Sequence, residues 1–467
     1  EAPGECFVYI TLPGETEPVT AGRFALTVDR RGVPEGRFVY GRSYLERPNA
    51  VALDPVELKL APRTYATASM GGVFGALRDA SPDSWGRRVI QRHLGKAQPS
   101  EMDYLLYSPD DRAGALGFGL NQTPPAPKRS FNRTLDLATV QAIADAIVAD
   151  EDQPAAGSGG DGVADADHDQ VEKLMVIGTS MGGARPKAVV EDDDGLWIAK
   201  FNRPDDHWNN ARVEHAMLTL ARACGLVTAE SRVVEVAGRD VLLVKRFDRE
   251  KTDAGYRRAR MVSALTLLRA EDTYQSRDKW SYVLLAEELR RVCAEPRQST
   301  AELFRRMCFN ALISNVDDHP RNHAVLARVT DWSLSPAYDL TPAVPVSLER
   351  RDLAMECGDA GRYANAENLL SQCARFLLDG TQARAIIDAM ETQVRGSWYA
   401  IARTTGVTAR DCDKIAPALS YPGFRQSLLK PVSPPSGRRE PTVGEVAKRN
   451  RVSVRNPVSS FSIGAPV

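Results

Sequence analysis

Asn315-Val-Asp-Asp-His-Pro-Arg-Asn322 is the most informative segment of this 467-residue chain. Within it, Asp317 precedes Asn322 by five positions, and another carboxylate, Asp339, follows further along the chain. An Asp that can deprotonate a hydroxyl, followed by an Asn and an Asp that can bind Mg²⁺, is the residue set of a phosphotransfer centre. The same residue types also form ordinary polar loops, so the rest of the chain must decide between these two interpretations.

The sequence predicts a regular helix directly before this loop. Between Thr300 and Asn315, apolar side chains recur at the 3.6-residue spacing of a helix face. A buried helix of this length would hold the Asp317 loop on a rigid element. The members of the apolar face are Leu303, Phe304, Met307, Cys308, Leu312 and Ile313.

A glycine-rich turn lies upstream, within residues 177–190. The spacing of Gly178 and Gly183 resembles a Walker A loop, but Ala184-Arg185 follows where that loop requires Lys-Ser or Lys-Thr. What remains is a turn between two strands, whose backbone N–H groups can lie over phosphates. An ordinary glycine-rich hairpin is the alternative for this stretch.

A lysine and a glutamate then follow with the spacing of a phosphate-binding ion pair. Lys200 ends an apolar strand, and Glu214 comes 14 residues later on a predicted helix, Asn209–Cys224. A strand Lys that faces a helix Glu is directed toward the α- and β-phosphates of a nucleotide. A further apolar strand ends in the charged run Lys245–Arg249, where a two-lobed kinase would place its hinge against adenine.

Changes in composition divide the chain into five segments. Alternating strands and then helical patterns fill the first, where Ser-Pro82-Asp83 is predicted to start a helix with Pro82 at its first position. The acidic, Gly-rich run that follows lacks apolar groups to bury, which predicts a mobile linker. The segments are an α+β domain at 1–125, a helix starting at Thr134 and the acidic linker at 126–170, an N-lobe with phosphate loop and hinge at 171–258, a nearly all-helical C-lobe with the catalytic loop at 259–420, and a basic tail, predicted to be disordered, at 421–467.

Composition excludes several classes of protein. A hydrophobic content of 43% and a charged content of 26% are typical of a soluble globular chain with two or three domains. The net charge of −1 provides no general attraction to nucleic acid or membrane surfaces. No apolar run approaches the roughly 18 residues that span a bilayer, and no signal segment is recognisable. The seven cysteines are scattered, and because Cys224, Cys293 and Cys308 fall within helical patterns, buried thiols are predicted rather than metal ligands or disulfides. The protein is predicted to be cytoplasmic.

Together, these motifs resemble the HipA family of type II toxin–antitoxin kinases over about residues 36–120 and 174–420. This resemblance implies an α+β, two-lobed protein-kinase-like fold with a small α+β N-terminal subdomain and an all-helical C-terminal lobe. The motifs that carry it, in chain order, are Leu77-Arg-Asp79-x3-Asp83-x-Trp85-Gly-Arg87, Ser180-x-Gly-Gly-Ala-Arg-Pro-Lys187, Trp197-Ile-x-Lys200-Phe, Val244-Lys-Arg-Phe247-Asp248-Arg249, Asp317-Asp-His319-x-Arg-Asn322 and Leu334-Ser-Pro-Ala-Tyr338-Asp339.

The resemblance also implies a function. Members of the family use ATP and Mg²⁺ to phosphorylate Ser or Thr of a cytosolic protein, best known as an aminoacyl-tRNA synthetase, and so arrest growth. They pair with HipB, a small helix-turn-helix antitoxin that binds operator DNA, so DNA would be bound mainly through the antitoxin and no membrane would be involved.

Site residues follow from the same resemblance. Asp317 would be the catalytic base, Asn322 and Asp339 would bind Mg²⁺, Lys200 would bind ATP, and Ser180 would be the autophosphorylation position. The residues expected to line the nucleotide site are Gly182, Gly183, Ala184, Arg185, Pro186, Lys187, Lys245, Arg246, Phe247, His319, Pro320, Arg321, Asn322, Tyr338 and Asp339.

Two positions depart from the best-studied branch of the family. Lys245 replaces an acid in the hinge, and Arg185-Pro186 replaces Gln-Glu in the phosphate loop. One alternative function is a small-molecule kinase of the antibiotic or choline phosphotransferase type, which the additional N-terminal domain disfavours. A second is a catalytically silent module that bridges an antitoxin to DNA, which the full set of catalytic residues disfavours.

A zinc site is a further alternative for the central stretch. His319 and His323 are four residues apart and lie next to Asp317 and Asp318. Because Pro320 interrupts the segment, the two histidines would not share a helix face, and zinc is disfavoured.

Overall fold

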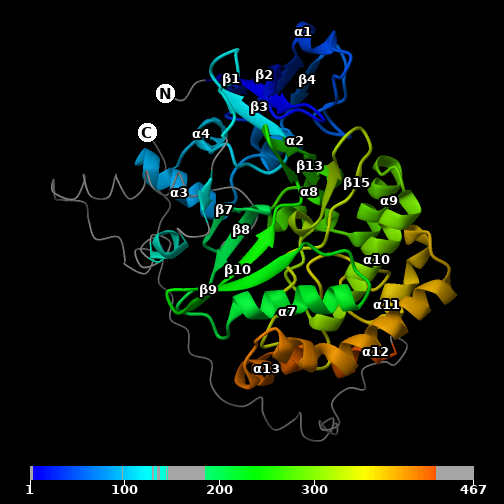
Figure 1. Ribbon diagram of the computed structural model, residues 1–467. Coiled ribbons are helices and arrows are strands. Elements are labelled where there is room, and N and C mark those ends of the chain that lie inside the picture. Colours follow the sequence, from blue (N-terminus) through cyan, green and yellow to red (C-terminus); the bar gives the residue numbers. More distant parts are fainter. Residues whose placement is uncertain are drawn as a thin grey trace, which may run out of the picture. The chain divides into compact units, whose positions relative to one another are not determined.

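The computed structural model describes residues 4–96, 98–128, 131–133, 137–142, 145 and 185–427. The chain divides into two compact units, Glu1–Gln426 and Ser427–Val467, and only Ser427 of the second unit is described. Most of the predicted acidic linker, the phosphate loop up to Ala184 and most of the predicted tail therefore lie outside the described residues. Figure 1 shows the arrangement of the elements within the first unit.

An antiparallel five-stranded sheet forms the core of the N-terminal domain, and the predicted strands of this region are confirmed. The sheet has the order β4-β3-β2-β1-β5, and side chains such as Val8 and Ile10 of its central strand are fully buried. The strands are β1 (Glu5–Thr11), β2 (Pro18–Val28), β3 (Pro34–Tyr40), β4 (Thr64–Thr67) and β5 (Leu116–Gly119).

Four short α-helices accompany this sheet in the described residues, and one of them begins later than predicted. Asp83, not a residue before it, is the N-cap of α3, because its carboxylate accepts a hydrogen bond from the backbone N–H of Gly86 at 2.8 Å. Pro82 therefore precedes the helix, and its assignment to the first helical position is wrong. The helices are α1 (Arg42–Leu45), α2 (Gly75–Asp79), α3 (Ser84–Leu94) and α4 (Glu101–Tyr107), with a 3-10 turn at η1 (Ser69–Gly72).

A second five-stranded sheet forms the N-lobe, in the order β6-β7-β8-β10-β9. Trp197 and Phe201 on one face of the sheet pack against Trp85 of α3, so the N-terminal domain covers this face. Helix α7 (Asn210–Ala223), with Asn209 as its N-cap, packs against β9 and β10 and confirms the predicted helix (Figure 1). The strands are β6 (Asn132–Arg133), β7 (Lys187–Asp192), β8 (Gly195–Phe201), β9 (Ser231–Val236) and β10 (Arg239–Lys245).

The C-lobe is built around α10 (Pro296–Ile313), whose predicted apolar face is fully buried. This helix packs against α9 and α12, so the segment that follows it starts from a rigid base. The helices around it are α8 (Ala264–Leu268), α9 (Tyr282–Val292), α11 (Ala366–Ser371), α12 (Gly380–Thr404) and α13 (Ala409–Ile415), with 3-10 turns at η3 (Tyr274–Lys279), η4 (Pro320–Asn322), η5 (Cys373–Phe376), η6 (Ala416–Ala418) and η7 (Pro422–Arg425).

The expectation of an all-helical C-lobe requires a correction, because this lobe also contains a three-stranded antiparallel sheet. Strand β14 leaves the catalytic loop and pairs with β13, so the sheet fixes the far end of the loop that α10 delivers. Its strands are β13 (Arg260–Ser263), β14 (Ala324–Ala327) and β15 (Ser333–Leu334), and a separate hairpin, β11 (Arg249–Thr252) and β12 (Gly255–Arg258), precedes them.

The boundary predicted for the basic tail also requires a correction. Tyr421 and Phe424 are buried in the main core, and Arg425 forms ion pairs with Asp388 and Glu391 of α12 at 2.6 and 2.5 Å. Residues 421–426 therefore belong to the first unit, and the prediction of disorder for later residues falls outside the described part of the chain.

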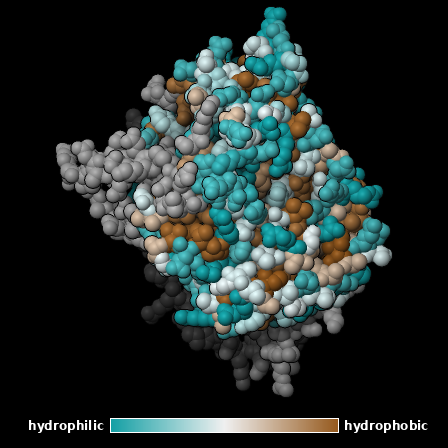
Figure 2. Space-filling view, in the orientation of Figure 1, coloured by the Kyte–Doolittle hydropathy of each residue, from teal (hydrophilic) through white to brown (hydrophobic). Residues whose placement is uncertain are grey.

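The distribution of residues on the surface and the state of the cysteines are consistent with the overall amino-acid composition. Hydrophilic and hydrophobic residues are interspersed on the face seen in Figure 2. All seven cysteines are free, and five of them are buried. Within the described residues, no helix combines the length and the apolar character needed to cross a membrane.

Candidate active site

The catalytic loop begins where α10 ends, at Ser314. Ser314 has a φ of 55°, which turns the chain out of the helix, and the next residue, Asn315, is buried. The amide of Asn315 donates to the Asn310 side chain at 3.1 Å and to the backbone carbonyl of Asp339 at 3.4 Å. Asn315 therefore joins the helix end to the segment that carries Asp339.

The predicted base and one predicted metal ligand lie on this loop, and the second ligand, Asp339, lines the same cavity as these two residues. The Asn322 amide donates to the backbone carbonyl of Asp317 at 3.3 Å, and the His319 N–H donates to the same carbonyl at 2.9 Å. These bonds close the turn from Asp317 to Asn322. The side chains of Asp317 and Asn322 line one polar cavity together with Asp339.

Lys200 makes two ion pairs, one within the N-lobe and one to Asp339 in the segment after the catalytic loop. Its ammonium nitrogen lies 2.6 Å from Glu214 on α7 and 2.9 Å from Asp339. Burial lowers the pKa of Lys200, but the two carboxylates outweigh burial and raise it above its ordinary value. Lys200 is therefore held as a cation, and the strand-to-helix ion pair inferred from the sequence spacing is present.

The two carboxylates respond to this lysine in different ways. Burial raises the pKa of Glu214 despite its contact with Lys200. Burial would also raise the pKa of Asp339, but Lys200 lowers it below its ordinary value. Asp339 is thus ionised at neutral pH, as a cation ligand must be.

Asp317, the base predicted from the sequence, lines the same cavity as Lys200 and Asp339. Burial raises the pKa of its carboxyl, the nearby Asp339 and Asp318 charges add to this effect, and His319 opposes it. A carboxylate with a raised pKa accepts a proton more readily than an ordinary one, which suits proton abstraction from a hydroxyl.

A second lysine, Lys187, lies beside Lys200 and is held by the N-terminal domain. The two lysines are direct partners across antiparallel strands β7 and β8, so they share one face of the sheet. Like charges at this position repel each other, and each lysine has its own counterion. The Lys187 ammonium lies 2.5 Å from Asp83, and both side chains are almost completely buried.

Asp83 is therefore a site residue that the sequence reasoning missed. Its motif supported the family resemblance, but a Ser-Pro-Asp sequence at a helix start indicates only an N-cap. Asp79 and Ser81 of the same segment also line the cavity at the hinge. The N-terminal domain thus forms one wall of the candidate active site.

Two adjoining cavities make up this site. The polar one has a volume of about 660 Å³, which lies within the usual range for ligand sites, and it contains Asp317. The second lies at the hinge between apolar side chains, where Phe247 and Tyr338 have ring centroids 5.6 Å apart. The residues that line both are Asp83, Lys200, Arg321, Asn322 and Asp339.

Most of the residues predicted from the sequence line these cavities. Ser180, Gly182, Gly183 and Ala184 lie outside the described residues, and Pro186 and Pro320 are not part of either lining. The predicted residues that do line a cavity are Arg185, Lys187, Lys200, Glu214, Lys245, Phe247, Asp317, His319, Arg321, Asn322, Tyr338 and Asp339.

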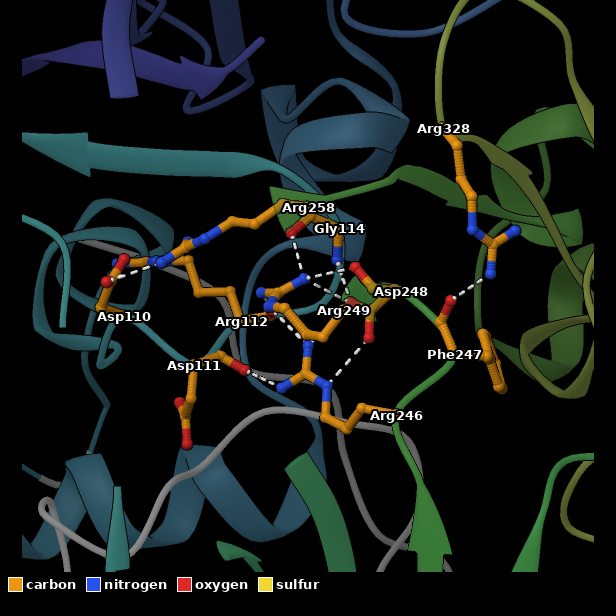
Figure 3. A network of polar contacts seen from close by, with 10 residues as sticks. All are labelled: Asp110, Asp111, Arg112, Gly114, Arg246, Phe247, Asp248, Arg249, Arg258 and Arg328. Atoms are coloured by element: carbon orange, nitrogen blue, oxygen red, sulfur yellow. Dashed lines mark hydrogen bonds and ion pairs between the residues drawn. The ribbon is translucent and has the colours of Figure 1, made fainter. Parts of the chain in front are cut away.

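Arg246 is placed differently from its neighbours in the hinge. Arg246 lines neither cavity, and its guanidinium donates to both carboxylate oxygens of Asp248, at 2.9 and 2.7 Å (Figure 3). Arg249 donates to the same carboxylate at 2.7 Å, and the Gly114 N–H donates to it at 2.9 Å. A nucleotide contact by the Arg246 side chain is therefore not supported, and the residue instead fixes the hinge.

This hinge network reaches the N-terminal domain. Arg246 donates to the backbone carbonyl of Asp111 at 2.5 Å, and Arg249 donates to those of Arg112 and Gly114 at 2.5 and 2.8 Å. The three charged side chains are almost fully buried, and each charge is paired and hydrogen-bonded. The network therefore ties the end of β10 to the segment that precedes β5.

The zinc alternative does not fit the contacts of the histidines. His323 Nε2 lies 2.8 Å from Asp318, whose carboxylate also accepts a hydrogen bond from Tyr282, and all three side chains are buried. Asp318 and His323 are thus part of the packing beneath the loop. No group of three or more His, Cys, Asp or Glu in the described residues is arranged to bind a metal ion.

The donor set nevertheless fits magnesium. Mg²⁺ in nucleotide sites is usually bound by one or two protein carboxylates or amides together with phosphate oxygens and water. Asn322 and Asp339 supply an amide oxygen and a carboxylate in one cavity, and only one Asp339 oxygen, Oδ1, contacts Lys200.

Comparison with known proteins agrees with this architecture. The HipA N-terminal domain family matches residues 19–119, and the HipA-like C-terminal domain family matches residues 179–398. The candidate kinase Y4mE of Sinorhizobium fredii (strain NBRC 101917 / NGR234) is 26% identical over 345 residues, which cover 71% of this chain and 77% of Y4mE. The candidate kinase Y4dM of the same strain is 30% identical over 179 residues, which cover 35% of this chain and 41% of Y4dM.

The fold is also that of a solved structure. A chain of the Shewanella oneidensis MR-1 complex of the toxin–antitoxin proteins HipA and HipB with operator DNA aligns with a TM-score of 0.62 and 17% sequence identity. The alignment covers 86% of this chain and 93% of that chain. The two-lobed, kinase-like fold is therefore confirmed, and with both characteristic domains matched, the chain belongs to the HipA family.

Proposed function

We propose that this chain is an ATP- and Mg²⁺-dependent serine/threonine protein kinase that acts as the toxin of a type II toxin–antitoxin pair. One observation carries the proposal: Lys200 joins Glu214 and Asp339 in the cavity that also contains Asp317 and Asn322. A silent scaffold has no need for this arrangement. The family and its candidate kinase relatives support a phosphotransfer activity.

We assign each residue of the site a role in the reaction. The apolar cavity at the hinge accepts the adenine, while Lys187 and Lys200 bind phosphate oxygens on the polar side. Asn322 and Asp339 hold the metal ion, which when bound neutralises the charge of the phosphates. Asp317 orients the acceptor hydroxyl and takes its proton as the hydroxyl oxygen attacks the γ-phosphorus of ATP, whose bond to the β,γ-bridging oxygen breaks to release ADP.

The partners follow from the family and from the charge of the chain. The Shewanella structure contains HipB and operator DNA, which supports a small helix-turn-helix antitoxin as the partner here. With a net charge of −1, the chain has little electrostatic attraction for DNA, so we propose that DNA is bound mainly through the antitoxin. The substrate is a cytosolic protein, and an aminoacyl-tRNA synthetase is the candidate that the resemblance suggests.

Expression in bacteria tests the toxin role. Wild-type chain produced without an antitoxin is expected to arrest growth, and Lys200→Ala is expected to relieve the arrest because the phosphate-binding ion pair is lost. The control is Lys251→Ala, which removes a half-exposed lysine outside both cavities and should still arrest growth. Equal arrest by wild type and Lys200→Ala at equal soluble levels, measured as colony counts, would contradict the proposal.

A regulatory step at Ser180 is part of the same proposal. Ser180 lies in the glycine-rich loop before Lys187, and a phosphate there would add roughly −1.5 to −2 charges beside the nucleotide phosphates. We expect this repulsion to hold the loop out of the nucleotide site and to silence the enzyme.

Mass spectrometry after incubation with ATP and Mg²⁺ should find phosphate on Ser180 in the wild type and not in Asp317→Asn. Ser180→Asp should no longer bind a fluorescent ATP analogue, whereas Ser180→Ala should bind it as the wild type does. Transfer to another protein with Ser180 unmodified would contradict the regulatory step alone.

A further inference from the structure

The N-terminal domain contributes an arginine to the polar cavity that the catalytic scheme does not use. Arg78, in the last turn of α2, lines the cavity that contains Asp317, but it does not line the apolar cavity at the hinge. Three further arginines line the same cavity: Arg185 pairs with Asp206 at 2.8 Å, whereas the charges of Arg87 of α3 and Arg321 of the catalytic loop act on Arg78. The guanidinium groups of Arg78, Arg87 and Arg321, from two domains, therefore meet beside the catalytic loop.

Arg78 differs from these neighbours in its counterions. Arg87 makes a bidentate ion pair with Glu101, with both distances 2.7 Å, and Arg321 lies 2.6 Å from Asp272. In the described part of the chain, no carboxylate lies within 4.0 Å of Arg78. Its hydrogen bond to a protein group is a long one, 3.4 Å, to the backbone carbonyl of Met70.

This environment is unfavourable for an isolated cation. Burial lowers the pKa of Arg78, the charges of Arg321 and Arg87 lower it further, and the more distant carboxylates of Glu101 and Asp272 only partly oppose this effect. A partly buried guanidinium between two others has five N–H donors to satisfy, and an anion in the cavity would satisfy them. The segment is also held in place, because the Met70 N–H donates to Glu271 at 2.9 Å.

We propose that Arg78, flanked by Arg87 and Arg321, binds an anionic group of the protein substrate beside the hydroxyl that receives the phosphate. This inference rests on the proposed kinase function and adds a substrate class: acceptor segments in which Asp or Glu lies near the target Ser or Thr. Arg78, Arg321 and Asp317 line the same cavity, so an anion bound there would share this cavity with the acceptor hydroxyl. A guanidinium fork matches the geometry of a carboxylate.

A nucleotide phosphate is the other possible source of the anion, and binding measurements separate the two. The probes are a fluorescent ATP analogue and two labelled peptides, Glu-Glu-Ser-Glu-Glu and Gln-Gln-Ser-Gln-Gln, the peptides being added to the full chain with a non-hydrolysable ATP analogue and Mg²⁺. Wild type should bind the Glu peptide about tenfold more tightly than the Gln peptide, the effect of one charge-assisted contact.

Variants of Arg78 test whether this residue causes the preference for the Glu peptide. Arg78→Gln should abolish the preference for the Glu peptide and leave the affinity for the ATP analogue within about twofold, while Arg78→Lys should retain part of the preference. The matched control is Arg42→Gln, which replaces an exposed arginine of α1 and should behave as the wild type does. Arg78→Lys also guards against a loss caused by misfolding, because it keeps the charge and the aliphatic stem.

Three results would overturn the inference. The first is that wild type binds both peptides equally or binds neither. The second is that Arg78→Gln keeps the preference. The third is that Arg78→Gln weakens binding of the ATP analogue more than tenfold, which would assign the anion to the nucleotide. Failure of the wild type to bind the ATP analogue would instead count against the proposed function itself, so the two failures are distinguishable.

Discussion

Asp317→Asn is expected to lower phosphoryl transfer by about a thousandfold while leaving nucleotide affinity nearly unchanged, because the carboxylate acts on the acceptor hydroxyl and not on the nucleotide. Asparagine keeps the size of the side chain and its cavity position but cannot accept the proton. The contrast with the metal ligand is informative, because Asp339→Asn should lose Mg²⁺-dependent nucleotide binding as well as transfer. Initial rates with labelled ATP and titrations with a fluorescent ATP analogue measure the two effects.

The control for this prediction is Asp331→Asn, which replaces an exposed aspartate in the turn after β14. It should leave both rate and affinity at wild-type values. Near wild-type transfer by Asp317→Asn would show that Asp317 is not the base. Loss of nucleotide binding together with transfer would instead indicate that Asp317 binds the metal ion or stabilises the fold.

The largest effect on stability is expected from the hinge network. Asp248→Asn removes the carboxylate that neutralises Arg246 and Arg249, and these side chains are almost completely excluded from water. Breaking a buried ion pair by removing one partner costs about 3–5 kcal/mol, because the remaining charge stays buried and unpaired. Chemical denaturation at pH 7 should therefore give a free energy of unfolding lower than the wild-type value by about this amount.

The same carboxylate predicts a pH dependence. Burial alone would raise the pKa of Asp248, but Arg246 and Arg249 outweigh burial and lower it below the ordinary aspartate value. A lowered pKa stabilises the folded state above the unfolded-state pKa of about 3.9, and this stabilisation is lost as the pH falls below that value. The difference between wild type and Asp248→Asn should thus be constant from pH 7 to pH 5 and shrink below about pH 4.

A surface aspartate provides the comparison for the network. Asp205 pairs with Arg203 at 3.0 Å, but its side chain is 69% exposed and solvent screens the pair, so Asp205→Asn should leave the free energy of unfolding nearly unchanged. Similar destabilisation by Asp205→Asn and Asp248→Asn would show that burial of the network does not determine its contribution. An Asp248→Asn variant as stable as the wild type would likewise show that burial of the network does not determine its contribution to stability.

Much of the candidate site could be predicted because its chemistry is encoded in short motifs. Lys200 stands at the end of an apolar strand, Glu214 on the next helix, and Asp317 directly after a helix with a clear 3.6-residue pattern. Local patterns of this kind fix which element carries each residue. The fold then brings the elements together as the motif spacing implies.

Contacts between distant segments could not be predicted in the same way. Asp83 and Lys187 are 104 residues apart, and neither residue type indicates its partner. The sequence around Arg246 shows only a charged run, which is typical of a solvated corner. Its burial depends on backbone carbonyls of residues 111 and 112 in another domain, and no local pattern reports on them.

The missed sheet of the C-lobe has a related cause. Strands β13, β14 and β15 have two to four residues each, too few to show a period of two. Their pairing depends on the path of the chain after the catalytic loop. The start of the tail was misplaced because Tyr421 and Phe424 lie in a segment rich in Pro and Ser, where composition conceals two buried aromatic rings.

The central claim is that this chain transfers phosphate from ATP to a serine or threonine of a protein, and one measurement tests it most directly. Purified wild-type chain and Asp317→Asn are incubated in parallel with γ-labelled ATP, Mg²⁺ and a dialysed bacterial lysate, and the labelled products are separated and hydrolysed. We predict label in protein as phosphoserine or phosphothreonine with the wild type and background label with Asp317→Asn. Label confined to the small-molecule fraction when undialysed lysate is used, or no difference between the two proteins, would contradict the claim.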